Sequence, residues 1–340
     1  MKEPKQITLP QLRKALLDVS RPLSPSYLYR FSDLTDSDLE EIKTFWGEIP
    51  VWRKQALFED LEEMAENDTL VSFDAISSFA LGDDDPRVRE LAIRNLWESE
   101  LPELIPVFIN MLNNDPDKSV RAAAASALGR FVFLGEIDAI SPKRLEEIEN
   151  QLIAAYKGHN ALIVRQRALE ALGYSSREEV VDFLREAYYS GNQELMLSSI
   201  FAMGRSANKD WIPFIQPLLS DENPAVRFEA ARAAGELEAV SCRDRLIELV
   251  DDSDYDVKMA AIWSLSQIGG EGVKETLVRL YDETDDDDIL YLVEDALDNL
   301  AFTESTGFFT ILDINELEDD DSELDIFDDD FDFDTLDDED

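Results

Sequence analysis

The chain has 340 residues, of which 44% are hydrophobic, and a formal net charge of −45 at pH 7. That hydrophobic content suffices for a large core, whereas the acidity argues against binding to nucleic acid or to anionic membranes. A basic protein partner is favoured electrostatically, although the charge could equally serve solubility or a salt-rich cytosol. The chain has no run of 18 apolar residues, no apolar signal core and one cysteine, Cys242. These features predict a cytoplasmic protein without internal disulfides or membrane spans.

Residues 1–50 are expected to form an N-terminal helical cap over the structure that follows, with partner binding as the alternative role. Apolar residues on one face predict a short amphipathic helix over Leu9–Val19. A second helix is predicted over Thr35–Trp46, with a capping box formed by Ser37 and Glu40 at its start.

One helical phrase returns through residues 51–302. It reads DKSVRAAAASALG at Asp117–Gly129 and NPAVRFEAARAAGEL at Asn223–Leu237, and it begins earlier as WRKQA at Trp52–Ala56. A phrase repeated at a fixed period is typical of a solenoid. Most steps are 31 or 32 residues, and the one longer step is attributed to an insertion at Phe131–Ser141. The valine position, numbered 0 below, recurs as Val88, Val120, Val164, Leu195, Val226, Val257 and Ile289.

The spacing within each phrase predicts how the repeats pack. Positions 0, +4 and +8 share a narrow arc of a helix with +7 beside it, and small residues at +4 and +7 would let neighbouring helices approach closely. Because no repeat can bury its apolar face alone, stacking creates the core. We therefore predict an all-α right-handed superhelix of about seven to eight helix pairs. A glycine at +9 is expected to end each first helix in the left-handed conformation, at Gly129, Gly173, Gly204 and Gly235.

These phrases resemble HEAT repeats, in particular the short class named after phycobilisome lyases, over about Val51 to Ala301. The resemblance implies the fold but little about function, because such repeats serve many roles. It raises the alternative of a bilin lyase-like subunit. Deoxyhypusine hydroxylases, another HEAT-like class, bind iron through paired His-Glu motifs, and this chain has a single histidine, His159. That activity is therefore not carried over.

A basic residue follows position 0 in most repeats. A ligand-binding role is one interpretation of this ladder. The other is structural: each guanidinium would pair with acidic or carbonyl groups of the adjacent turn, where Asp85, Asp117 and Asp254 stand. The ladder consists of Arg53, Arg89, Arg121, Arg165, Arg227 and Lys258.

Bulky apolar residues occupy positions +2 and +6 of the later repeats, which should face solvent. Aligned over successive repeats, they would form a stripe. Large exposed apolar patches usually mark an interaction surface, so this apolar stripe is a candidate partner-binding site; the alternative is that the chain itself covers it. The stripe consists of Leu197, Phe201, Phe228, Met259, Trp263 and Tyr291.

Residues 303–340 are expected to be an acidic, disordered tail. Of the 28 residues from Asp313 onward, 17 are Asp or Glu, and apolar residues are interleaved with them. Like-charge repulsion should keep such a segment unfolded on its own. Phe327, Phe331 and Phe333 are candidates to dock on the apolar stripe or on a basic partner, whereas a purely solubilising tail is the alternative.

No catalytic, metal-binding or cofactor-binding set is apparent. Because His159 is the only histidine, a metal site built from a histidine cluster is excluded. A Ser-His-Asp or Cys-His set would have to use His159 itself. Cys242 is expected at a helix start, where its thiol pKa could fall, or else as a small packing residue. We therefore predict a non-enzymatic protein–protein interaction scaffold without a cofactor. The alternatives are the bilin lyase-like subunit and an acidic chaperone or decoy that holds basic proteins through the tail.

Overall fold

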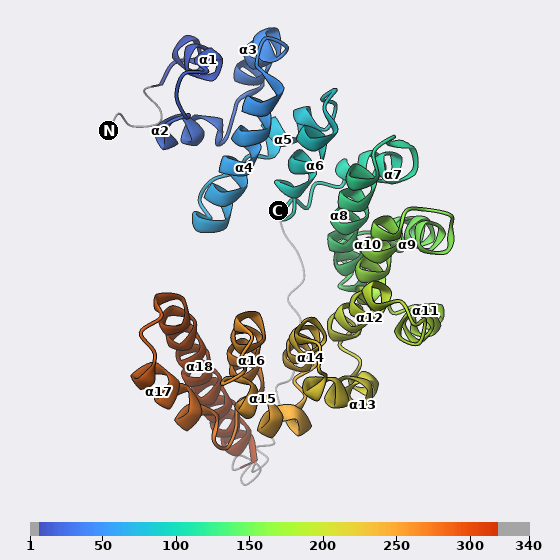
Figure 1. Ribbon diagram of the computed structural model, residues 1–340, viewed down its shortest axis with the longest axis vertical. Coiled ribbons are helices and arrows are strands. Elements are labelled where there is room, and N and C mark those ends of the chain that lie inside the picture. The colour runs from blue at the N-terminus through green and yellow to red at the C-terminus, as the bar shows by residue number, and fades with distance from the viewer. Residues whose placement is uncertain (1–6, 319–340) are drawn as a thin grey trace, which may run out of the picture.

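The computed structural model describes residues 7–318, with side chains described as far as Phe302. This part of the chain is built of helices and contains no strand. Successive helix pairs form an open ring in which the first helix of each pair lies inside and the second lies outside (Figure 1). The first helices are α4 (Val51–Asn67), α6 (Pro86–Arg94), α8 (Lys118–Glu136), α10 (Leu162–Ala171), α12 (Gln193–Arg205), α14 (Pro224–Glu236), α16 (Tyr255–Ile268) and α18 (Asp287–Glu318).

The second helices cover the outer side of the ring, and one of them is short. Helix α13 (Ile212–Ile215) is flanked by 3₁₀ turns at Lys209–Trp211 and Gln216–Ser220. The buried Trp211 anchors that turn in the core. The remaining second helices are α5 (Asp74–Ala80), α7 (Leu104–Asn114), α9 (Pro142–Lys157), α11 (Glu178–Tyr188), α15 (Arg243–Leu249) and α17 (Val273–Glu283). The predicted α-solenoid is thus confirmed.

The +9 glycines bring neighbouring first helices together rather than ending them. None of the four has a positive φ, so the expected left-handed stop is wrong. A Cβ on Gly173 would lie 2.8 Å from the Ala202 Cα, and one on Gly204 would lie 2.9 Å from the Ala233 Cα. Each glycine therefore meets the small +7 residue of the next repeat, and only a hydrogen side chain permits that approach. Positive φ occurs instead at four other glycines and at four non-glycine residues of the described chain: Gly191, Gly269, Gly270, Gly272, Asp33, Asp138, Ala207 and Glu238.

The long step between Val120 and Val164 lengthens helices instead of adding a loop. Helix α8 runs through most of the expected insertion to Glu136, and α9 has 16 residues. Phe131 and Leu134 are buried, which explains why the helix continues. An apolar face that keeps helical spacing extends the helix it belongs to.

The N-terminal helices α1 (Leu9–Leu17), α2 (Pro25–Leu28) and α3 (Asp36–Trp46) pack on the first repeat. Buried Trp46 donates to Asp83 (2.7 Å), which also accepts from Lys54 (2.7 Å). Helix α3 is capped by Thr35 with Asp38, not by the predicted Ser37 and Glu40. The boundary expected at residue 50 falls immediately before α4.

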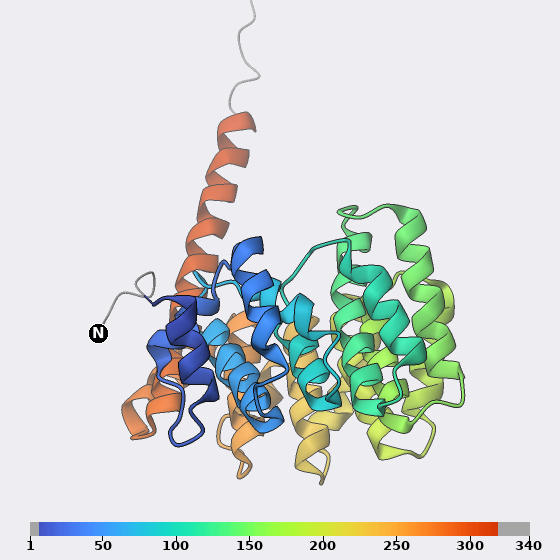
Figure 2. The same cartoon turned by 90° about the horizontal axis from the view of Figure 1, so that it is seen from above.

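Helix α18 crosses the boundary expected between residues 302 and 303 and continues to Glu318. Its C-terminal part projects beyond the other helices (Figure 2). Phe327, Phe331 and Phe333 lie outside the described residues.

Candidate functional site: the concave groove

A groove of about 1120 Å³ runs along the inside of the ring and crosses α4, α6, α8, α10 and α12. The first helices supply its floor, and in α8, α10 and α12 the small +7 and +9 residues let neighbouring helices approach closely. The outer helices do not contribute to it. The groove is therefore a concave surface built from the inner helices of successive repeats.

The end of the groove at α4 and α6 is acidic. Glu62, Glu66 and Glu98 line it, and Arg94 is the basic residue between them. The Arg94 Nε donates to Glu62 (2.7 Å), which leaves Glu66 and Glu98 exposed. This acidic end of the groove is suited to basic groups of a ligand.

The other end, at α8 to α12, combines aromatic rings with arginines. Together with Arg232 and the glutamates of α14 beside it, we call it the arginine–aromatic cluster. Phe133 packs edge-on against Tyr174, with ring centroids 5.5 Å apart. The Arg205 guanidinium lies 5.0 Å from the Tyr174 ring centroid and 4.1 Å from that of Phe201. From the next repeat, the Arg232 guanidinium lies 3.9 Å from the same Phe201 ring. The Phe201 ring is thus in contact with two guanidinium groups, an arrangement held by cation–π attraction.

Arg205 has no ion pair or hydrogen bond among the described residues. It is half-buried, and burial lowers the pKa of its guanidinium from the ordinary value. Its neighbours differ: Arg167 donates to Glu170, and Arg232 lies 3.1 Å from Glu229 and 3.4 Å from Glu236. A half-buried guanidinium without an acceptor in the described residues keeps its N–H donors available for a ligand.

The carboxylates around Arg205 are also incompletely matched. Burial raises the pKa of Glu229 and of Glu236 above the usual range, and Arg232 only partly opposes this. Of the seven buried side-chain atoms without a hydrogen-bond partner in the described residues, three lie here: Arg130 Nε, Arg232 Nη2 and Glu236 Oε2. Arg232 Nη2 is near Glu229 Oε2 but lacks hydrogen-bond geometry. Buried polar groups are normally paired, and these three atoms have no such partner among the described residues.

The apolar stripe is less exposed than its positions predicted. Tyr291 is 75% exposed, but the other five residues are half-buried. Leu197, Phe228 and Met259 pack against the core, and the Trp263 ring lies over Gly235 of the preceding repeat. The close approach of neighbouring first helices lets side chains at +2 and +6 reach the adjacent helix. Only Phe201 of the six lines the groove.

The arginine ladder makes structural contacts. Arg227 donates twice to Asp252 (2.8 and 2.9 Å) and to the carbonyl of Asp221 (2.8 Å), and Arg89 pairs in the same way with Asp115. Arg53, Arg121 and Arg165 donate to backbone carbonyls, whereas Lys258 forms no such bond within residues 7–302. The aspartates expected as partners cap helices instead: Asp85, Asp117 and Asp254 accept from backbone N–H groups.

The groove residues share positions that the repeat spacing defines. Arg167 and Glu229 stand at +3, Phe201 and Arg232 at +6, and Arg205 at +10. These positions lie within about 60° of one another on a helix. Comparing them across repeats would have identified the arginine–aromatic cluster. The apolar stripe, at +2 and +6, covers only one edge of the helix face that carries +3, +6 and +10.

Cys242 and His159 are not among the residues that line the groove. Cys242 is buried, and burial raises the pKa of its thiol, contrary to the fall considered for a helix start. His159 is exposed in the connection before α10. Within residues 7–318 no group of three or more metal-ligating side chains is assembled, and none of the described helices is long and apolar enough to cross a membrane.

The similarity to known proteins lies in the repeats. The family model for HEAT repeats matches residues 73–148, 189–241 and 238–298, which together make up more than half of the chain. A HEAT repeat-containing taxis protein of Halobacterium salinarum is 26% identical over 113 residues. That match covers 33% of this chain and only 28% of the relative.

Two solved structures are similar at low identity. The complex of CpcE and CpcF of phycocyanin lyase from Nostoc sp. PCC7120 is 19% identical, with a TM-score of 0.45, over 67% of this chain and 94% of that chain. Human deoxyhypusine hydroxylase is 21% identical, with a TM-score of 0.34, over 76% of this chain and 95% of that chain. We draw no conclusion about function from these likenesses.

Proposed function

The chain belongs to the HEAT-repeat family, and from this premise we propose that it is a non-enzymatic cytoplasmic scaffold that holds a protein partner in its concave groove. The observation that carries the proposal is Arg205, a half-buried guanidinium that stacks on Tyr174 and Phe201 and has no hydrogen-bond acceptor among the described residues. Arginine and aromatic residues in a concave, partly desolvated site are the residues that dominate binding energy at protein interfaces.

The charge of the groove constrains the partner. Glu66 and Glu98 at one end favour basic groups, and Arg205 at the other favours a carboxylate beside an aromatic or apolar side chain. A partner segment that lies along the groove would therefore present opposite charges at its two ends. The net charge of −45 favours a partner that is basic elsewhere on its surface.

We place this role above the bilin lyase-like subunit and the acidic chaperone, because the groove supplies a specific observation for it. A chaperone acting through the tail would not require Arg205 or Phe201. Binding that survives replacement of both residues but depends on residues 319–340 would favour the chaperone instead.

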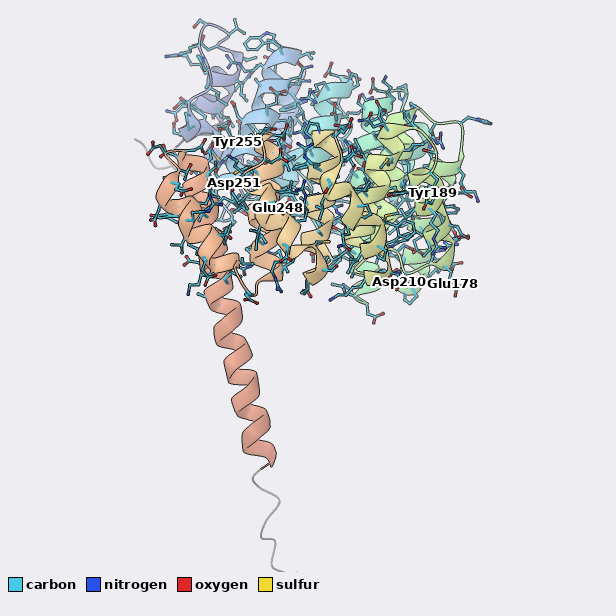
Figure 3. The ribbon with its side chains drawn as sticks, turned by 60° about the horizontal axis from the view of Figure 1, so that its bottom comes forward. Glu178, Tyr189, Asp210, Glu248, Asp251 and Tyr255 are labelled. Carbon is cyan, nitrogen blue, oxygen red and sulfur yellow. The ribbon has the colours of Figure 1, made fainter. Side chains whose placement is uncertain are left out.

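Site-specific photo-crosslinking in cells tests the proposal. The photoreactive residue p-benzoylphenylalanine would replace Ser126, which is exposed in the groove on α8. The matched control replaces Glu178, which is exposed at the start of the outer helix α11 (Figure 3). We expect one protein to be captured from Ser126 and not from Glu178, and its capture to fall in the Arg205→Ala background. Equal capture from both positions, or none from Ser126, would reject the groove as the binding surface.

A further inference from the structure

The arginine–aromatic cluster is close to neutral in a chain that is otherwise acidic. Arg130, Arg167, Arg205 and Arg232 converge there, and the carboxylates beside them are Glu100, Glu170, Glu229 and Glu236. Four positive charges thus balance four negative charges, whereas the chain as a whole has a net charge of −45. Within the described residues, Arg205 is the one of the four arginines without an ion pair, so it is the group of the cluster that can accept an acidic segment.

The chain itself contains a segment with the complementary chemistry. Of the 22 residues from 319 to 340, 14 are Asp or Glu and none is basic, with Phe327, Phe331 and Phe333 spaced among them. Carboxylates can accept from Arg205 in the bidentate geometry that guanidinium groups prefer. A neighbouring phenylalanine ring can pack on Phe133 or Tyr174, as aromatic pairs do in interfaces.

We propose that residues 319–340 dock in cis on the arginine–aromatic cluster, with Phe331 against Tyr174 and Phe201 and the adjacent carboxylates on Arg205. The inference rests on the groove being a binding surface, as proposed above. It adds the occupant: the chain's own C-terminal segment holds the arginine–aromatic cluster until a partner displaces it.

The segment has a long reach. From Phe302 to Glu318, α18 extends by about 24 Å at 1.5 Å per residue. The return must cover this length and also cross the open ring from α18 to α10 (Figure 1). The 22 residues from 319 to 340 span up to about 73 Å when extended. Tethering also raises the effective concentration of the segment to the millimolar range. Weak individual contacts therefore suffice for occupancy of the groove.

Photo-crosslinking within the full-length chain tests the docking. The residue p-benzoylphenylalanine replaces Phe331, and crosslinked peptides are located by mass spectrometry after irradiation of the purified protein at low salt. We expect crosslinks to peptides that contain Phe133, Tyr174 or Phe201, at a yield that does not change on tenfold dilution. Arg205→Ala should lower that yield at least about threefold, because a charge-assisted bond is lost. Arg185→Ala, which removes a guanidinium stacked on Trp211 on the outer side, should not.

Three outcomes would overturn the docking: crosslinks scattered over the outer helices, no crosslinks, or crosslinks between copies that vanish on dilution. A crosslinking yield that is the same in wild type and in Arg205→Ala would also overturn the docking. The capture experiment from Ser126 keeps the two proposals separate. If Ser126 captures a partner and Phe331 does not reach the groove, only the cis docking fails; if both experiments fail, the proposed function fails with it.

Discussion

Two half-buried arginines in this chain, Arg227 and Arg205, differ in how many of their hydrogen-bond donors are paired. Arg227 in the ladder gives two bonds to Asp252 and two to backbone carbonyls, which uses nearly all of its donors. Arg205 in the groove stacks on two rings and has no acceptor among the described residues. The comparison teaches that a repeated arginine serves the fold when its repeat supplies the acceptor. An arginine without an acceptor is available for a ligand.

The largest expected effect on stability comes from replacing Arg227, the arginine whose donors are paired. Arg227→Ala should lower the free energy of unfolding by about 3 kcal/mol, because it leaves Asp252 buried without its partner. Urea denaturation followed by circular dichroism measures this change. A loss below about 1 kcal/mol would show that the fold does not need the ladder. It would contradict the distinction between a structural Arg227 and a ligand-binding Arg205.

The close approach of the first helices, which forms the floor of the groove, predicts the next effect. Gly173→Ala places a Cβ 2.8 Å from backbone atoms of Ala202, so the helices must move apart at a cost of about 2 kcal/mol. Gly47→Ala is the control, because no atom lies within 4 Å of its added Cβ. Thermal unfolding should separate the two variants. If both melt at the same temperature, the glycine contact is not the cause of the close packing.

Arg205, which has no acceptor among the described residues, should contribute little to stability. Arg205→Ala removes two cation–π contacts of a half-buried side chain, and we expect a change in unfolding free energy of about 1 kcal/mol or less. The same denaturation experiment as for Arg227→Ala gives the number. A loss as large as that of Arg227→Ala would place Arg205 among the structural arginines.

The pH dependence of the two regions should have opposite sign. The hydrogen bonds from Arg227 lower the pKa of Asp252, so its contribution is present above the unfolded pKa and is lost as the pH falls through the folded value. Burial raises the pKa of Glu236, so wild type should gain stability relative to Glu236→Gln as the pH falls from 7 toward about 5.

Urea denaturation of wild type and Glu236→Gln at several pH values between 5 and 7 checks this smaller effect. An unchanged difference, or a loss for wild type on acidification, would indicate that Glu236 is ionised at no cost. The groove carboxylates would then be as well satisfied as Asp252.

The sequence sufficed for the solenoid because its repeat is explicit. The valine, alanine and glycine positions recur at a nearly constant period, and each packs against its counterpart in the next repeat. The role of the glycines was misjudged, since a glycine at a helix end and one at a helix contact look alike in the sequence. Only the distance from Gly173 to Ala202 distinguishes them.

The site was predicted only in part, and Phe201 is the residue of the apolar stripe that lines the groove. Leu197 and Met259, both at +2, lie beside the +6 position of Phe201 on the helix surface, but they pack against the core. Whether a side chain at these positions is covered depends on the distance to the neighbouring helix. Whether an arginine is paired depends on side chains from another repeat, as Arg227 and Asp252 show. Such contacts between repeats cannot be read from the spacing within one repeat.

The most direct test of the groove as a binding surface is the affinity of the purified partner, recovered by crosslinking from Ser126, for three forms of the chain. Isothermal titration calorimetry would compare wild type, Arg205→Ala and the outer control Arg185→Ala. We predict about tenfold or greater weakening for Arg205→Ala, with no change for Arg185→Ala and melting temperatures close to wild type in both. Equal affinity for all three forms would contradict the account.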